Sequence, residues 1–170
     1  MRVALVSDSH GDVRRLRRAL DALVARGAEA VVHCGDVGSV ECVAALGDAA
    51  PTALAVAGNM DRRVDQLAAA AERAGVTFST RHVELDIGGG AETPSGLVAT
   101  HGDDARLLAE LIRGEQFAYV CHGHTHRRRD ERFGAVRVIN PGALRHPRGG
   151  SGPGAALLDT DAGAVNWVKP

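Results

Sequence analysis

The sequence has few aromatic residues, few cysteines and no long apolar run. Aromatic side chains make up 3% of its 170 residues, which argues against the base-stacking surface that single-strand nucleic-acid binders use. Cys34, Cys42 and Cys121 form no C-x-x-C pair, so no disulfide framework is expected. The apolar run Val3–Val6 is too short for a signal-peptide core, and no run reaches the ~18 residues of a membrane span. These absences predict a cytoplasmic protein.

The charges are balanced, and the length is modest. The chain has 20 basic and 21 acidic residues, a net charge of −1, and 45% apolar residues. No basic excess indicates nucleic-acid binding through phosphates. A chain of this length suits one domain with a proper hydrophobic core, so residues 1–170 are predicted to form a single domain.

Apolar periodicity predicts an α/β fold that changes character half-way. The first half alternates three expected strands (Arg2–Ser7, Ala30–Cys34, Ala53–Ala57) with three expected helices (Val13–Arg26, Ser39–Leu46, Arg62–Ala74), as in a parallel sheet built from βαβ units. The second half has one expected helix, Asp104–Arg113, a glycine-rich turn from Gly88 to Gly96, and extended segments at Thr77–Ile87, Leu97–Thr100, Phe117–Cys121, Ala135–Ile139, Ala155–Leu158 and Val165–Val168. This half predicts a second sheet packed against the first, with helices outside.

Short polar clusters follow five of the apolar runs. Each contains Asp, Asn or His beside a glycine or a tight turn: Asp8-Ser9-His10, Gly35-Asp36, Gly58-Asn59-Met60-Asp61, His101-Gly102 and Gly123-His124-Thr125-His126. A two-metal hydrolytic site needs this distribution, because carboxylates and imidazoles from several strand ends must converge on cations ~3.5–4 Å apart.

Spacing within the clusters suggests individual roles. Alternate residues of an extended backbone point to the same side, so Asp8 and His10 can face one metal. His124 and His126 have the same spacing, to which the same reasoning applies. A carboxylate has two oxygens, which makes Asp36 the candidate bridge between two cations; the alternative is an Asx-turn.

Two further aspartates are expected to cap helices rather than to bind metal. Asp12 is placed to cap the helix that starts at Val13, and Asp61 the helix that starts at Arg62. Of the remaining histidines, two stand in apolar runs and are expected in the core or beside the ligands, His33 and His122. The other two, His82 and His146, are expected at the surface.

The five clusters, in this order between Met1 and about Gly142, resemble the motifs of the calcineurin-like metallophosphoesterases, in particular their small phosphodiesterase branch. The resemblance implies a four-layered α-β-β-α sandwich of two mixed sheets flanked by helices. It places one metal among Asp8, His10, Asp36 and His126, and the other among Asp36, Asn59, His101 and His124. Spacing alone leaves open which metal His124 and His126 each serve.

The resemblance implies a phosphodiesterase that uses a metal-bridging hydroxide as its nucleophile, so no side chain is assigned as catalytic. The expected cofactors are two divalent ions, with Mn²⁺ preferred and Fe²⁺, Zn²⁺ or Ni²⁺ as alternatives, because the ligands are mixed oxygen and nitrogen donors. The expected partner is a small phosphate ester, contacted by the Asn59 amide and by Arg127. Arg127–Arg129, followed by Asp130 and Glu131, is otherwise a charge run on a solvent-facing turn.

Met60 departs from the family pattern that the resemblance implies. The larger phosphatases have a proton-donating His at this position, and the small branch usually has Cys. A thioether donates no proton, so aryl diesters should be turned over faster than alkyl monoesters. The alternatives are a phosphomonoesterase or cyclic-nucleotide hydrolase with the same site, and a catalytically weak protein-binding scaffold like the retromer subunit that resembles this family. A homo-oligomer is left open.

Overall fold

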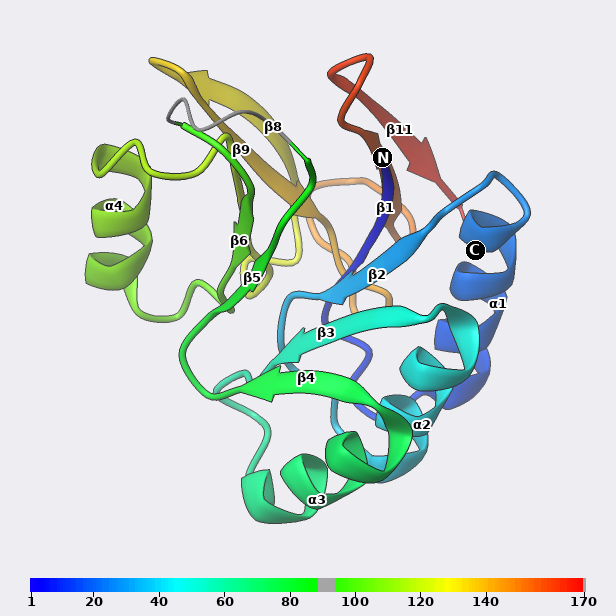
Figure 1. The fold of residues 1–170 in the computed structure, drawn as a ribbon. Helices are drawn as coiled ribbons and strands as arrows, with labels where there is room; N and C mark the ends of the chain where they lie inside the picture. The colour runs from blue at the N-terminus through cyan, green and yellow to red at the C-terminus, as the bar shows by residue number, and fades with distance from the viewer. Residues whose placement is uncertain (89–93, 170) are drawn as a thin grey trace.

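The strands of the computed structural model form two sheets, whose inner faces pack on each other (Figure 1). The structure describes residues 1–88 and 94–169; residues 89–93 of the predicted glycine-rich turn lie outside them. The six-stranded sheet has the order β11-β10-β1-β2-β3-β4. Its strands are β1 (Arg2–Val6), β2 (Ala30–His33), β3 (Thr52–Val56), β4 (Val76–Ser79), β10 (Ala155–Asp159) and β11 (Ala164–Val168).

Strands β1 to β4 run parallel, and β10 and β11 extend that sheet in antiparallel pairs. The five-stranded sheet has the order β5-β6-β7-β9-β8, with β6, β7 and β9 parallel and the two edge strands antiparallel to their neighbours. These strands are β5 (Val83–Leu85), β6 (Leu97–Ala99), β7 (Tyr119–Cys121), β8 (Arg128–Phe133) and β9 (Val136–Pro141).

Helices cover the two outer faces. The first three helices, α1 (Val13–Val24), α2 (Val40–Ala49) and α3 (Val64–Ala74), cover the larger sheet, and α4 (Ala105–Arg113) covers the smaller one (Figure 1). Alternation along β1 decides which core layer each residue joins. Ala4 and Val6 pack under the helices, whereas Val3 and Leu5 pack between the sheets. The predicted four-layered sandwich is confirmed.

Two predicted segments differ from the structure. The expected extended segment Thr77–Ile87 divides into β4 and β5, which belong to different sheets. The charge run after His126 is not a turn but most of the edge strand β8, in which Asp130 forms a bidentate ion pair with Arg137 of β9. Edge strands tolerate charged side chains because one backbone edge and much of the strand face water, so apolar alternation does not reveal them.

The carboxyl ends of the parallel strands meet at one edge of the sandwich. The loops that leave β1, β2 and β3 carry Asp8, Asp36 and Asn59, and the loops that leave β6 and β7 carry the histidine clusters. Sites in α/β proteins form where such strand ends converge. Within the described residues, no helix combines the length and apolar character needed to cross a bilayer.

Candidate metal centre

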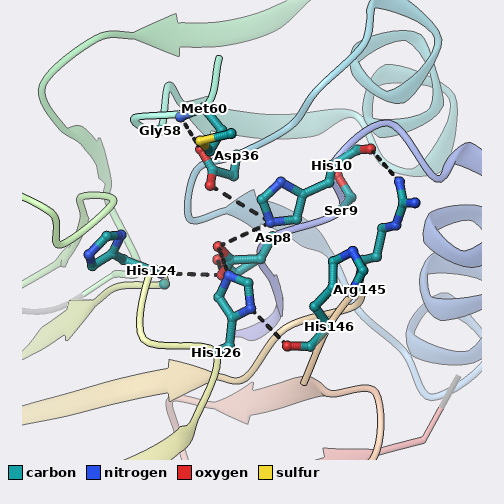
Figure 2. A network of polar contacts seen from close by, with 12 residues as sticks. Asp8, Ser9, His10, Asp36, Gly58, Met60, His124, His126, Arg145 and His146 are labelled. Carbon is teal, nitrogen blue, oxygen red and sulfur yellow. Dashed lines mark hydrogen bonds and ion pairs between the residues drawn. The ribbon is translucent and has the colours of Figure 1, made fainter. Parts of the chain in front are cut away.

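The first group of side chains consists of Asp8, His10 and His126. The Oδ1 atom of Asp8 lies 3.2 Å from Nε2 of His126 and 4.0 Å from Nε2 of His10 (Figure 2). These three residues come from the loops after β1 and β7, and their donor atoms lie within 4.8 Å of one another. One carboxylate oxygen and two imidazole nitrogens form a donor set that divalent transition metals accept.

The second group lies beside the first and contains His101, Asn59 and His124. The Asn59 Oδ1 atom is 3.0 Å from Nε2 of His101 and 3.2 Å from Nδ1 of His124. The two histidines of the Gly-His-Thr-His cluster therefore face different groups. Spacing alone left open which metal each histidine serves, and the division that the resemblance implies agrees with the geometry.

Asp36 lies between the two groups. Its Oδ2 atom is 3.8 Å from Nε2 of His10 and 3.6 Å from Nε2 of His101, while its Oδ1 atom accepts a hydrogen bond from the Met60 backbone N–H at 2.8 Å. A single carboxylate oxygen thus faces both groups, rather than one oxygen for each as the sequence argument assumed. Asp8 also reaches this region, because donor atoms of Asp8, Asp36 and His101 lie within 4.8 Å of one another.

Hydrogen bonds on the far side of two imidazole rings fix which nitrogen is free. Nδ1–H of His101 donates to the Cys34 carbonyl at 3.0 Å, and Nδ1–H of His126 donates to the His146 carbonyl at 2.8 Å. In their neutral form these rings hold a lone pair on Nε2, and the Nε2 atoms face the acceptor oxygens of Asn59 and Asp8. An acceptor that faces another acceptor is repulsive unless a cation or proton lies between them.

Two buried polar atoms of the candidate ligands also have no hydrogen-bond partner among the described residues, Oδ1 of Asp8 and Nε2 of His10. Leaving such atoms unpaired is costly in a protein interior. The other Asp8 oxygen, Oδ2, is satisfied by the Ser7 hydroxyl at 2.6 Å and by the His124 backbone N–H at 3.2 Å. Within the candidate ligands, the atoms without a partner are the ones that face the shared space, so the residues present fit a pair of divalent cations.

Burial shifts the titration of two of these groups. It raises the pKa of the Asp8 carboxyl above its ordinary value and lowers the pKa of the His10 imidazole, in each case by penalising the charged form. A cation beside a buried carboxylate favours the charged form and offsets that penalty. The buried Asp8 carboxylate is therefore better suited to lie beside a bound cation than in an uncharged surrounding.

The backbone of the candidate ligands is left-handed. Five of the seven have positive φ angles: Asp8 (53°), His10 (46°), Asp36 (54°), His124 (64°) and His126 (60°). Asp8 and His10 are therefore not in the extended conformation that their spacing was taken to indicate. Non-glycine residues adopt this region rarely, and they do so mostly where the surrounding structure requires a particular side-chain direction.

Close packing explains the glycines of the polar clusters. A Cβ atom on Gly123 would overlap the Ser7 hydroxyl and would lie 2.6 Å from the Cys34 carbonyl oxygen and 2.8 Å from Oδ2 of Asp8. A Cβ atom on Gly35 would overlap the His101 ring. Glycine is needed at these two positions because the loops that carry the candidate ligands pass directly against one another.

Asp61 has a different role from the predicted one. Helix α3 begins at Val64, and the Asp61 side chain does not cap it. Instead, the buried carboxylate accepts hydrogen bonds from three backbone N–H groups, those of Val37 (3.0 Å), Gly38 (2.7 Å) and Gly58 (2.9 Å). Asp61 therefore ties the loop of Asp36 to the loop of Asn59. Asp12 caps α1 as predicted, accepting from the Arg15 N–H at 3.0 Å.

Two buried side chains that the sequence argument left without a definite role brace the same loops. Nε2 of His33 lies 2.8 Å from the Ser9 hydroxyl, which donates to the Val37 carbonyl, so this ring donates through Nε2–H. Burial lowers the pKa of His33 to about 3. Asn140 donates to the Gly123 carbonyl at 2.7 Å and to the Thr125 hydroxyl at 3.1 Å, holding the loop that carries His124 and His126.

The remaining histidines and Arg127 agree with their expected positions in part. His122 is buried, and burial lowers its pKa to about 4. His146 is exposed as expected, whereas His82 is half-buried beside Glu84. Arg127 is exposed and lines an open cleft of about 890 Å³ above the candidate ligands. The other residues of that cleft are His10, Asp36, Asn59, Met60, His124, Thr125, His126, Arg145, His146 and Arg148.

Comparison with known proteins identifies the family. The model of the calcineurin-like phosphoesterase superfamily domain matches residues 1–163. The chain belongs to this superfamily. Members of the superfamily bind divalent metals, and the two Asp/His groups described above are in keeping with that property.

Relatives of this superfamily member are named as phosphodiesterases. Phosphodiesterase MJ0936 of Methanocaldococcus jannaschii is 26% identical over 95% of this chain and 94% of its own length. Phosphodiesterase YfcE of Escherichia coli is 27% identical over 97% and 91%. Two solved structures share the fold. An archaeal phosphodiesterase superposes with a TM-score of 0.84 (24% identity, 99% of both chains), and a Zn²⁺ complex of Vps29 from Entamoeba histolytica with 0.65 (18% identity, 99% and 97%).

Proposed function

We propose that the protein is a phosphodiesterase that depends on two divalent cations, with Mn²⁺ as the first candidate. The observation that carries the proposal is the set of imidazole and oxygen donor atoms that point into one shared space, among them the unpaired Oδ1 of Asp8 and Nε2 of His10. Asp8, His10 and His126 would hold one cation, and Asn59, His101 and His124 the other, with Asp36 between them. Bound there, the cations would supply a nucleophile at neutral pH and hold the phosphate oxygens.

The residues around the cleft orient the substrate. The Asn59 side chain is exposed at the cleft, where its NH₂ group can donate to a phosphate oxygen while its carbonyl oxygen faces the histidines. Arg127 adds a guanidinium on the rim, whose planar fork matches phosphate. The cleft is open, so the organic parts of an ester can extend along it on either side of the phosphorus.

Met60 sets the leaving-group preference. Its side chain is 52% exposed and lines the cleft, and its backbone N–H is bonded to Asp36 (Figure 2). The thioether cannot protonate a departing oxygen, so departure depends on the intrinsic acidity of the leaving group. Diesters with aryl leaving groups should therefore be hydrolysed faster than alkyl monoesters such as serine phosphates.

The decisive experiment combines metal analysis with a substrate panel. The purified protein, loaded with Mn²⁺, Fe²⁺, Zn²⁺ or Ni²⁺ in turn, is assayed with bis(p-nitrophenyl) phosphate, p-nitrophenyl phosphate and a cyclic nucleotide. We expect two bound cations per chain and fastest turnover of the aryl diester. Asp36→Ala should abolish turnover and reduce the metal content, whereas Asp21→Ala, an exposed change on α1, should do neither. Full activity of Asp36→Ala would remove Asp36 from the site.

The same panel separates the alternatives. Faster hydrolysis of a monoester or of a cyclic nucleotide would favour the other phosphoesterase classes, and metal binding without turnover would favour a scaffold like Vps29. The four large apolar side chains exposed among the described residues are distributed over α1, the loop after β3, β8 and β11: Val24, Met60, Phe133 and Trp167. Arginines lie over two of them, Phe133 and Trp167. This distribution favours the enzyme over the scaffold.

A further inference from the structure

Three arginines line one side of the cleft, and we refer to Arg127, Arg145 and Arg148 as the arginine rim. Among the residues that line the cleft, Asp36 is the one carboxylate. Within the described part of the chain, no carboxylate comes within ion-pair distance of the rim, although six arginines elsewhere do form such pairs, as Arg137 does with Asp130. The rim is thus a concentration of uncompensated positive charge on a protein whose net charge is −1.

The loop that carries two of these arginines is fixed to the candidate metal centre. The backbone N–H groups of Leu144 and Arg145 donate to the carbonyls of Ser7 and Asp8, each at 3.0 Å, and the N–H of Arg148 donates to the His126 carbonyl at 2.9 Å. The loop contributes no candidate ligand of its own. Its attachment to both ligand-bearing loops holds the arginines in register with the site.

The side chain of Arg145 reaches the same edge. Its guanidinium Nη1 donates to the His10 carbonyl at 3.3 Å, as Figure 2 shows. Arg127 directly follows His126 along the chain. The rim therefore lies on the side of Asp8, His10 and His126, while Asn59 and Met60 belong to the loop after β3. A phosphate held over the candidate ligands would have the rim on one side.

We propose that the arginine rim binds a second anionic group, so that the preferred substrates are phosphodiesters that carry an additional phosphate on the part of the molecule that does not leave. The proposal rests on the proposed phosphodiesterase function and specifies its substrate class. The cleft of about 890 Å³ has room for more than the scissile phosphate. Guanidinium groups recognise phosphate by paired hydrogen bonds, and an uncompensated cluster of them favours a doubly charged group over a neutral one.

The kinetic test uses two diesters that share their leaving group. They are thymidine 5′-(p-nitrophenyl phosphate) and the same compound with a 3′-phosphate, assayed with the metal-loaded full chain. We expect a higher kcat/KM for the 3′-phosphorylated diester. In Arg145→Gln and Arg148→Gln that preference should fall by about tenfold each, the effect of one charge-assisted hydrogen bond of about 1.4 kcal/mol.

The control is Arg113→Gln. Arg113 is exposed at the end of α4, on the approach to the amino end of β7, whereas the site forms at the carboxyl ends. Its substitution should leave the preference intact. Absence of any preference in the native protein, or an equal loss on both diesters in the rim variants, would overturn the proposal.

A binding measurement separates this proposal from the proposed function. In EDTA, calorimetric titration should show tighter binding of thymidine 3′,5′-bisphosphate than of thymidine 5′-monophosphate, and the double variant Arg145→Gln/Arg148→Gln should lose the difference. Equal binding of the two nucleotides, or binding of neither, would contradict the proposal that the arginine rim binds a second anionic group. Selective bisphosphate binding without turnover of either diester supports the rim and rejects the phosphodiesterase. Turnover of the diesters without selective bisphosphate binding supports the phosphodiesterase and rejects the proposed role of the arginine rim.

Discussion

Removal of the Asp61 carboxylate should destabilise the protein through the loops of the site rather than through a helix cap. Three backbone N–H groups donate to this side chain at 2.7–3.0 Å, and it is only 6% exposed. Hydrogen bonds to a charged group contribute about 1.5–3 kcal/mol each, but water entry and loop relaxation recover part of that in a small cavity. We therefore expect Asp61→Ala to lower the free energy of unfolding by about 3 kcal/mol. For a chain of this size that loss lowers the melting temperature by roughly 6–12 °C.

Asp61→Asn tests the hydrogen bonds more specifically, because it keeps the size and shape of the side chain. One oxygen of Asp61 accepts from Val37 and Gly58, and the other accepts from Gly38, so the amide NH₂ must face at least one backbone N–H in either orientation. It should cost about half as much as the alanine variant. Urea unfolding followed by circular dichroism, in EDTA, measures both. The reasoning fails if Asp61→Ala unfolds within about 0.5 kcal/mol of the exposed control Asp21→Ala.

Two further predictions concern leaving groups and acid stability. Met60→His places an ionisable group at an exposed position in the cleft, so it should raise kcat for alkyl monoesters relative to bis(p-nitrophenyl) phosphate. Met60→Leu should leave this ratio of kcat values unchanged. An equal ratio in the two variants would exclude a role of this position in leaving-group departure. His33 takes up a proton only near pH 3 when folded but at its ordinary pKa of 6.5 when unfolded, so stability is unaffected above pH 6.5 and falls as the pH decreases below it. At pH 4.5 the loss should be about 2–3 kcal/mol. His33→Gln, whose amide can replace the Nε2–H donor to Ser9, should remove this part of the pH dependence in urea unfolding, and an unchanged pH profile would show that His33 titrates normally.

The sequence reveals the core of the fold because buried strands and amphipathic helices have strong apolar patterns. Leu16, Ala19, Leu20 and Leu23 of α1 are all buried, at the spacing that predicted this helix. Strand β8 has no such pattern, since four of its six residues are exposed and charged side chains dominate it. Its position depends on pairing with β9, a long-range contact that local composition does not encode.

In the site, too, local sequence patterns predict some features, whereas others depend on long-range contacts. Strand ends followed by Asp, Asn and His indicated which residues meet, because parallel strands deliver their carboxyl ends to one edge. The role of Asp61 was not visible, since the helix was expected to begin at Arg62, directly after Asp61, whereas α3 begins at Val64. Only the structure shows that Gly38, 23 residues away, provides one of its donors.

The left-handed conformation of the candidate ligands explains why the same spacing has two outcomes, since Asp8 and His10 lie in one group whereas His124 and His126 lie in two. Each such residue costs of order 1–3 kcal/mol, so five of them need compensation nearby. The loops after β1 and β2 provide it by continuing the hydrogen bonding of the two strands. The backbone N–H of Asp8 donates to the Gly35 carbonyl at 3.0 Å and that of His10 donates to the Asp36 carbonyl at 2.9 Å, so these two strained residues are held by the opposite loop. Because backbone bonds fix both loops, a side-chain variant such as Asp36→Ala should remove donor atoms while leaving the positions of the others in place, and its effects on metal content and turnover can then be assigned to the carboxylate itself.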